Sequence, residues 1–203
     1  MTDPGVSLSP IKLISGQSPF CQVFFDNVRA DKANLIGKVN EGWTVGKRLL
    51  QHERSSIGGG GSSRFGISMT LNEAAKKYRG DENGKIDDPL LKLELTRQDI
   101  DTQAFALTTQ RITDETMSGV TPGFATSMLK YYGSELTKDS AEMMVSIMGP
   151  QGLGRDDDHD NFSDDERGST RAWLFTKALT IAGGCSEVQL DIISKHILEL
   201  PTG

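Results

Sequence analysis

From residue 43 onward, apolar side chains recur every three or four residues, the spacing of one face of an α-helix. The first such stretch runs from Trp43 to about Lys77 and is interrupted by glycines at positions 58–61. Asp88 then precedes Pro89, and this pair combines a good N-cap residue with a proline at the first helical position. The pattern therefore predicts a long helix over 43–77 and a second helix that begins at Pro89.

Thr121 and Pro122 repeat the same start signal, and the helix that follows ends at the glycine and proline of positions 149–150. A final pair of helices is predicted at about 170–181 and 186–198. The apolar positions expected on the third helix have a mostly four-residue spacing: Phe124, Met128, Tyr132, Leu136, Met144 and Met148. Four or five helices with short connections indicate an antiparallel up-and-down helical bundle.

The first part of the chain has a different pattern. Residues 7–14 and 21–28 resemble strands, and Gly16 with Ser18 and Pro19 marks a turn between them. The fold class expected is therefore mainly α, a helical bundle preceded by a short β segment. We expect the β segment to occupy residues 1–38 and the bundle residues 39–203.

The composition excludes several classes of function. A net charge of −6 without a basic block argues against nucleic acid as a partner. Cys21 and Cys185 lie far apart without metal-type spacing, and the acidic stretch 154–168 lacks the pattern of a calcium loop, so no metal is expected and this stretch is predicted to be a solvated surface loop. No apolar run approaches the roughly 18 residues of a membrane span, which favours a soluble cytoplasmic protein.

The most specific motif lies near the C-terminus, where Gly183, Gly184, Cys185, Ser186 and Glu187 open an apolar helix. Two glycines permit a tight turn and close approach of a ligand to the backbone, and the first amide groups of the helix point outward toward polar or anionic ligand atoms. This run, with its helix ending at Leu-Pro, resembles the C-terminal signature of acyl-CoA dehydrogenases. An ordinary helix cap is the alternative for the motif taken alone.

A second match lies in the first quarter of the chain. Leu35 and Gly37 are followed by an Asn-Glu-Gly-Trp turn at 40–43, and Leu50 to Arg54 match the Leu-x-x-Glu-Arg element of the same family. The resemblance implies a chain about twice as long, with an N-terminal helical domain, a middle β-domain and a C-terminal bundle. The present sequence is similar to the last strands of the β-domain plus the bundle, as expected of a fragment or a truncated gene product.

The resemblance also implies a reaction, the α,β-desaturation of an acyl-CoA thioester with FAD as hydride acceptor. In many members the catalytic base stands where this chain has Gly183, which has no side chain. Other members carry the base on the long helix, at the position of Glu53. We therefore expect Glu53 to be the base and Arg54 to hold the site geometry; the alternatives are a surface glutamate and an ordinary salt bridge between helices.

The remaining site residues follow from the same resemblance. Gly184, Cys185, Ser186 and Glu187 match the stretch that contacts the flavin, with Cys185 in place of the usual threonine. The positions expected to contact the substrate are Leu50, Gln51, His52, Gly183 and Lys195, although His52 and Lys195 are also ordinary residues of a helix surface. The glycines at 58–61 cost helix stability, which favours a widened pocket for a branched or ring-bearing acyl chain; close helix packing is the alternative.

The function predicted is thus that of part of a flavin-dependent acyl-CoA dehydrogenase that forms a homo-oligomer, a dimer or tetramer. An acyl-CoA oxidase of the same superfamily and a non-catalytic oligomerising bundle are the alternatives. The electron acceptor is left open. The 203-residue chain alone is expected to be helical, colourless and inactive, because the rest of the flavin and acyl sites would lie on the missing domains.

Overall fold

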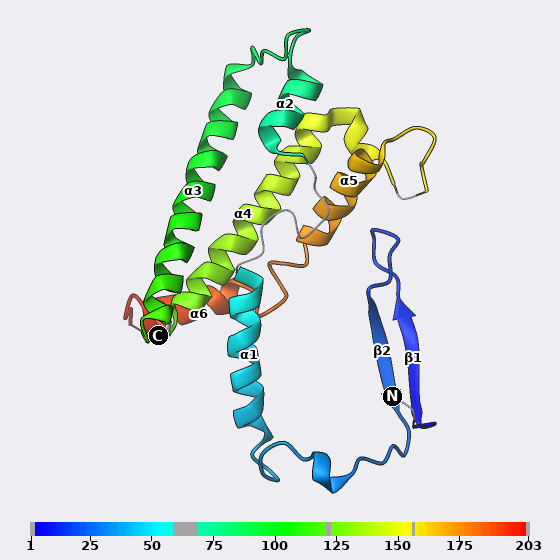
Figure 1. The fold of residues 1–203 in the computed structure, drawn as a ribbon, viewed down its shortest axis with the longest axis vertical. Coiled ribbons are helices and arrows are strands. Elements are labelled where there is room, and N and C mark those ends of the chain that lie inside the picture. The colour runs from blue at the N-terminus through cyan, green and yellow to red at the C-terminus, as the bar shows by residue number, and fades with distance from the viewer. Residues whose placement is uncertain (1–2, 59–68, 121–122, 156, 202–203) are drawn as a thin grey trace. The chain divides into compact units, whose positions relative to one another are not determined.

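The computed structural model describes residues 3–58, 69–120, 123–155 and 157–201; the side chains of 51–58 are outside this description. The chain divides into two compact units, residues 1–50 and 51–203, and each is described by itself. A mainly α fold with a short β segment, as predicted, is confirmed (Figure 1).

The first unit begins with two antiparallel strands, β1 (Val6–Ile11) and β2 (Phe20–Phe25), paired so that Val6 faces Phe25. Both strands end earlier than the sequence predicted. The backbone of Leu13 turns back to bond Gln17 at 2.8 Å, and Asn27 has a positive φ of 52° that extended strands do not allow. A 3₁₀ helix, η1 (Lys32–Asn34), follows the strands.

Helix α1 (Gly42–Gly58) crosses from the first unit into the second, and α2 (Leu71–Arg79) belongs to the second. The prediction of one helix from 43 to 77 is wrong in its second half. Thr70 starts a new helix, because its hydroxyl accepts from the Glu73 amide while the Glu73 carboxylate accepts from the Thr70 amide. The glycines at 58–61 lie largely outside the described residues.

Helix α3 (Pro89–Met117) begins where the sequence predicted. One carboxylate oxygen of Asp88 accepts hydrogen bonds from the amides of Leu90 at 2.9 Å and Leu91 at 3.1 Å, which confirms the cap. The side chain of Gln98 donates to the Leu136 carbonyl at 3.2 Å and ties α3 to the next helix.

Helix α4 (Ala125–Met148) is the central helix of the second unit and packs against α2, α3, α5 and α6 (Figure 1). Of the apolar positions expected on this helix, Phe124 and Tyr132 in the first half are exposed. The buried side chains of this half belong instead to Ser127, Lys130 and Ser134. Met144 and Met148, two further apolar positions expected on this helix, are buried, and the 3₁₀ helix η3 (Gly149–Leu153) follows.

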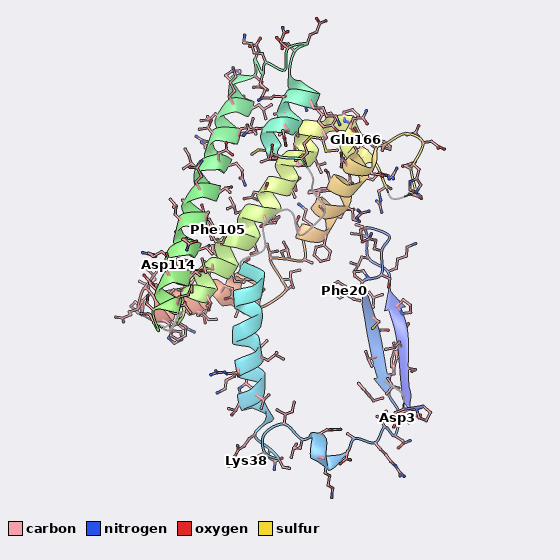
Figure 2. The ribbon with its side chains drawn as sticks, viewed as in Figure 1. Asp3, Phe20, Lys38, Phe105, Asp114 and Glu166 are labelled. Carbon is pink, nitrogen blue, oxygen red and sulfur yellow. The ribbon has the colours of Figure 1, made fainter. Side chains whose placement is uncertain are left out.

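Helix α5 (Asp164–Thr176) starts inside the stretch that the sequence predicted to be a loop. Ser163 and Glu166 form a capping box, and Glu166 also accepts a 3.0 Å hydrogen bond from the hydroxyl of Tyr78 on α2 (Figure 2). Three acidic residues in the first turn suit the positive end of a helix, which explains why an acidic run becomes helical here. Helix α6 (Ser186–His196) completes the order of elements.

The apolar core lies at one end of α4. Buried residues of α2, α3 and α4 form it: Ala74, Ala75, Leu91, Leu95, Met144, Ile147 and Met148. Arg79, the last residue of α2, donates to the carbonyls of Ser146 at 2.9 Å and Ile147 at 3.0 Å, and so caps the last turn of α4. The other end of α4 packs against α6, where the ring of Phe124 stacks on His196 with centroids 4.2 Å apart.

Candidate functional site

The turn that leads into α6, residues 183–187, has the geometry that its glycines require. Gly183 and Gly184 have φ values of 70° and 99°, which residues with a Cβ rarely adopt. A Cβ on Gly184 would lie 2.5 Å from the side-chain nitrogen of Gln189. That nitrogen donates to the carbonyls of Gly183 at 3.2 Å and Gly184 at 3.4 Å, so the two glycines and Gln189 together fix the path of the turn.

Cys185 is the N-cap residue of α6, and its half-buried side chain makes no cap bond to the helix in the described structure. The next residue, Ser186, donates from its hydroxyl to Glu135 of α4 at 3.0 Å. Glu187 is exposed, and its pKa is lowered, first by its own backbone amide and then by the side chain of Cys185. The start of α6 is therefore anchored to α4 while its cap position carries no side-chain oxygen.

Two buried side chains at this turn have polar atoms without a hydrogen-bond partner among the described residues: the amine of Lys130 and the amide oxygen of Gln189. Both residues are fully buried. Burial lowers the pKa of Lys130, while Cys185, Glu135 and Glu187, in that order, act in the opposite direction. Sequence reasoning missed Lys130 and Glu135; the spacing of Ser127, Lys130 and Ser134 on one helical face is the signal that could have found the lysine.

The predicted catalytic residues lie on α1. Leu50 is half-buried within the first unit, and Gln51, His52, Glu53 and Arg54 continue the same helical backbone. Their side chains lie outside the described residues. A helical backbone puts Leu50, Glu53 and Arg54 on one face, because residues three and four apart are neighbours on a helix.

Of the remaining candidates, Gly183 shapes the 183–187 turn, and Lys195 lies on the exposed side of α6. The Lys195 amine pairs with the Asp191 carboxylate at 2.9 Å, one helical turn earlier. Such an exposed i,i+4 pair is an ordinary surface feature, although it leaves the amine free to exchange partners with a ligand phosphate.

Two further observations concern the described part of the chain. It contains no cluster of three His, Cys, Asp or Glu side chains that could hold a metal ion. No described helix is long and apolar enough to cross a membrane.

The chain is similar to known proteins over most of its length. Residues 40–198 match the sequence model of the acyl-CoA dehydrogenase C-terminal domain. Acyl-CoA dehydrogenase FadE34 of Mycobacterium tuberculosis is 30% identical over 207 residues, which covers 99% of this chain and 26% of FadE34.

Solved structures with a similar fold also match the chain. The ChsE4–ChsE5 complex from Mycobacterium tuberculosis matches with a TM-score of 0.76 and 25% identity, over 100% of this chain and 52% of that one. A protein described as the Tcur3481–Tcur3483 steroid ACAD matches with a TM-score of 0.80 and 23% identity, over 99% and 50%. The chain thus spans about half the length of these solved chains and a quarter of FadE34. It belongs to the acyl-CoA dehydrogenase family, of which it carries the C-terminal domain.

Proposed function

We propose that this chain is the C-terminal part of an FAD-dependent acyl-CoA dehydrogenase that desaturates an acyl-CoA thioester between its α and β carbons. The observation that carries the proposal is the 183–187 turn. Its two positive-φ glycines and the side chain of Gln189 fix the shape of the start of α6, within a domain of the matching family.

The chain's own contribution to the reaction is the base. The α-proton of a thioester is weakly acidic, so the group that removes it needs a raised basicity, which exclusion of water supplies. Glu53 is the proposed base and takes this proton onto its carboxylate, because Gly183 offers no side chain at the other position that the family uses. Arg54, its neighbour on α1, would hold the carboxylate or the adjoining backbone in place by charge-assisted hydrogen bonds.

The residues of the turn are suited to a flavin nucleotide. The absence of a Cβ at Gly184 makes room for the amide of Gln189, and the side chain of Cys185 makes no cap bond to the backbone of α6 but interacts with the Glu187 carboxylate. The proposed flavin contacts are Gly184, Cys185, Ser186 and Glu187 at the start of α6, where the positive end of the helix favours the polar or anionic atoms of a nucleotide. When bound, the flavin accepts the β-hydrogen of the substrate as a hydride.

The proposed substrate contacts are Leu50, Gln51 and His52 on α1, Gly183 in the turn, and Lys195, whose amine would meet the coenzyme A phosphates. A branched or ring-bearing acyl chain is the proposed substrate class. Two points support it: the loss of side-chain bulk at the glycines of 58–61, and the similarity in fold to a protein described as a steroid ACAD.

We further propose that the complete protein is an oligomer, a homodimer or homotetramer. One similar solved structure is described as the ChsE4–ChsE5 complex, which supports association. Exposed apolar side chains along α3, such as Leu93, Ile100 and Leu107, are consistent with a further surface that a partner covers.

Replacement of Glu53 by glutamine in the active protein that contains this sequence tests the base. Turnover should fall by about 10²-fold or more, because removal of a general base typically costs 10² to 10⁴. Flavin absorbance should be retained, since Glu53 is not proposed to bind it. The exposed Glu82 provides the control, because Glu82→Gln makes the same chemical change away from α1. A fully active Glu53→Gln enzyme would contradict the assignment.

A further inference from the structure

The connection between α5 and α6 contains the first part of the 183–187 turn. It runs from Lys177, the residue after α5, to Cys185, the residue before α6. Four of its amides bond carbonyls three or four residues earlier: those of Ala178, Leu179, Ile181 and Ala182. Local bonds of this kind give the segment its shape, but its place on the bundle depends on contacts with other helices.

Glu142 on α4 holds the first end of this connection. Its carboxylate accepts a 2.7 Å hydrogen bond from the indole nitrogen of Trp173 on α5 and pairs with the amine of Lys177. The same amine lies over the Trp173 ring, 5.1 Å from its centroid. The bond from Lys177, and then the bond from Trp173, lower the pKa of Glu142, so the carboxylate is charged at neutral pH.

Glu135, also on α4, holds the second end. Its carboxylate accepts a 3.0 Å hydrogen bond from the hydroxyl of Ser186, the first residue of α6, and pairs with Lys138 on its own helix. The Glu135 side chain is 27% exposed, against 54% for Glu142. The bond to Ser186 is therefore the better shielded from water of the two attachments.

The two carboxylates lie on the same face of α4. They are seven residues apart, which is about two turns of an α-helix. Helix α4 packs against both α5 and α6, so one face of it reaches the residue where the connection begins and the residue where it has just ended. The connection is thus attached to α4 at both ends by charged side chains.

We propose that Glu135 and Glu142 are positioning residues: they hold the two ends of the segment 177–186 on one face of α4 and so determine where the 183–187 turn lies on the bundle. Neither carboxylate belongs to the residues proposed to contact the flavin or the substrate. The ligand part of this inference rests on the proposed function, in which the turn contacts a flavin nucleotide. The attachment of the segment to α4 does not.

The attachment can be measured on the 203-residue chain without flavin, by amide hydrogen exchange of Glu135→Ala and Glu142→Ala. Alanine is the strongest helix former, so neither change weakens α4 itself. Each variant should speed the exchange of amides 178–186 by about threefold, because a partly exposed charged contact contributes only modestly. The variant with both changes should exceed either one. The amides of α3 should exchange at the rates of the parent chain.

Two further variants make the result specific. Glu135→Gln keeps an oxygen that can accept from Ser186, so its exchange over 178–186 should be slower than that of Glu135→Ala. Glu115→Ala makes the same change at an exposed position of α3 and should leave these amides unaffected. If amides 178–186 exchange at the parent rate in both Glu135→Ala and Glu142→Ala, the proposal is wrong. Faster exchange throughout all helices would indicate a general loss of stability and would also overturn it.

Flavin affinity tests the ligand part separately. In the FAD-binding protein that contains this sequence, Glu135→Ala and Glu142→Ala should each bind FAD about threefold more weakly, since a less firmly held turn loses part of its preorganisation. Titration followed by flavin fluorescence measures the affinity, and Glu115→Ala should bind like the parent protein. Faster exchange over 178–186 with unchanged FAD affinity would support the attachment and contradict the flavin-binding role of the turn.

Discussion

The two halves of helix α4 bury different kinds of side chain. At its C-terminal end, Met144, Ile147 and Met148 lie in an apolar core with residues of α2 and α3. At its N-terminal half, the buried side chains are Ser127, Lys130 and Ser134, and the partner helix α6 contributes the buried Gln189. One helix therefore has a face that changes from apolar to polar along its length.

The apolar end of α4 contributes mainly to the stability of the fold, and the polar end contributes the contacts near the proposed binding site. The apolar end gains free energy from buried surface and tolerates exchange of similar side chains. The polar end depends on particular hydrogen bonds, and each unsatisfied group there costs free energy. The 183–187 turn packs against the polar half of α4. The side-chain hydrogen bonds therefore lie near the proposed ligand site, and the apolar packing that stabilises the fold lies at the other end of the helix.

The largest effect is expected at the apolar end. Ile147→Ala should lower the free energy of unfolding by about 2–5 kcal/mol, because a fully buried isoleucine loses its packing and leaves a cavity. Chemical denaturation followed by circular dichroism measures this. Ser146→Ala, at the exposed neighbouring position, should change the free energy by less than about 0.5 kcal/mol. An Ile147→Ala chain as stable as the parent would mean that the apolar end is not the main source of stability.

A smaller and more specific effect is expected at the polar end. Gln189→Leu keeps the size of the side chain but leaves the carbonyls of Gly183 and Gly184 without their donor, at a cost of about 1–3 kcal/mol. Gln103→Leu makes the same change on the exposed face of α3 and is the matched control. Chemical denaturation followed by circular dichroism measures the free energy of unfolding of both variants. Equal stability of the two variants would show that Gln189 does not hold the turn.

The smallest effect depends on pH. The hydrogen bond from Lys138 lowers the pKa of Glu135, burial opposes this, and the bond from Ser186 adds to the lowering. A carboxylate with a lowered pKa stabilises the fold above its unfolded pKa of about 4.3, and this contribution is lost as the pH falls through the folded value. The difference in stability between the parent chain and Glu135→Gln should be about 1 kcal/mol at pH 7 and should shrink below pH 4.

The exposed Glu94 serves as the control for this series, as Glu94→Gln should track the parent chain more closely at every pH. A difference for Glu135→Gln that stays constant from pH 7 to pH 3 would show that its charge does not contribute. Thermal unfolding at a series of pH values measures the stability of the parent chain, of Glu135→Gln and of Glu94→Gln.

The comparison also explains which features could be predicted from sequence. The cap at Asp88 and the glycine turn at 183–184 were predictable, because local chemistry alone determines them. The buried face of α4 was not. Apolar side chains at 124 and 132 suggested a buried stripe, but small residues are needed where helices approach closely: a Cβ on Gly133 would lie 2.7 Å from the ring of Phe105 on α3 (Figure 2). Tyr132 lies beside the Phe105 ring, with the ring centroids 5.9 Å apart, and remains exposed.

Lys130 was missed for a related reason. A lysine in a helix is normally solvated, whereas the fold buries this one completely. The start of α5 was missed because a run of acidic residues usually indicates a solvated loop. Here the same charges lie in the first turn of a helix, capped by Ser163, where they are favourable.

Arg79 gives the apolar end of α4 one further property. Its side chain belongs to the short helix α2, yet it bonds the last carbonyls of α4, 67 and 68 residues away. When α2 lifts off, α4 loses both its apolar cover and the groups that close its final turn. We therefore expect the two segments to open and close together, although the chain between them contains the whole of α3.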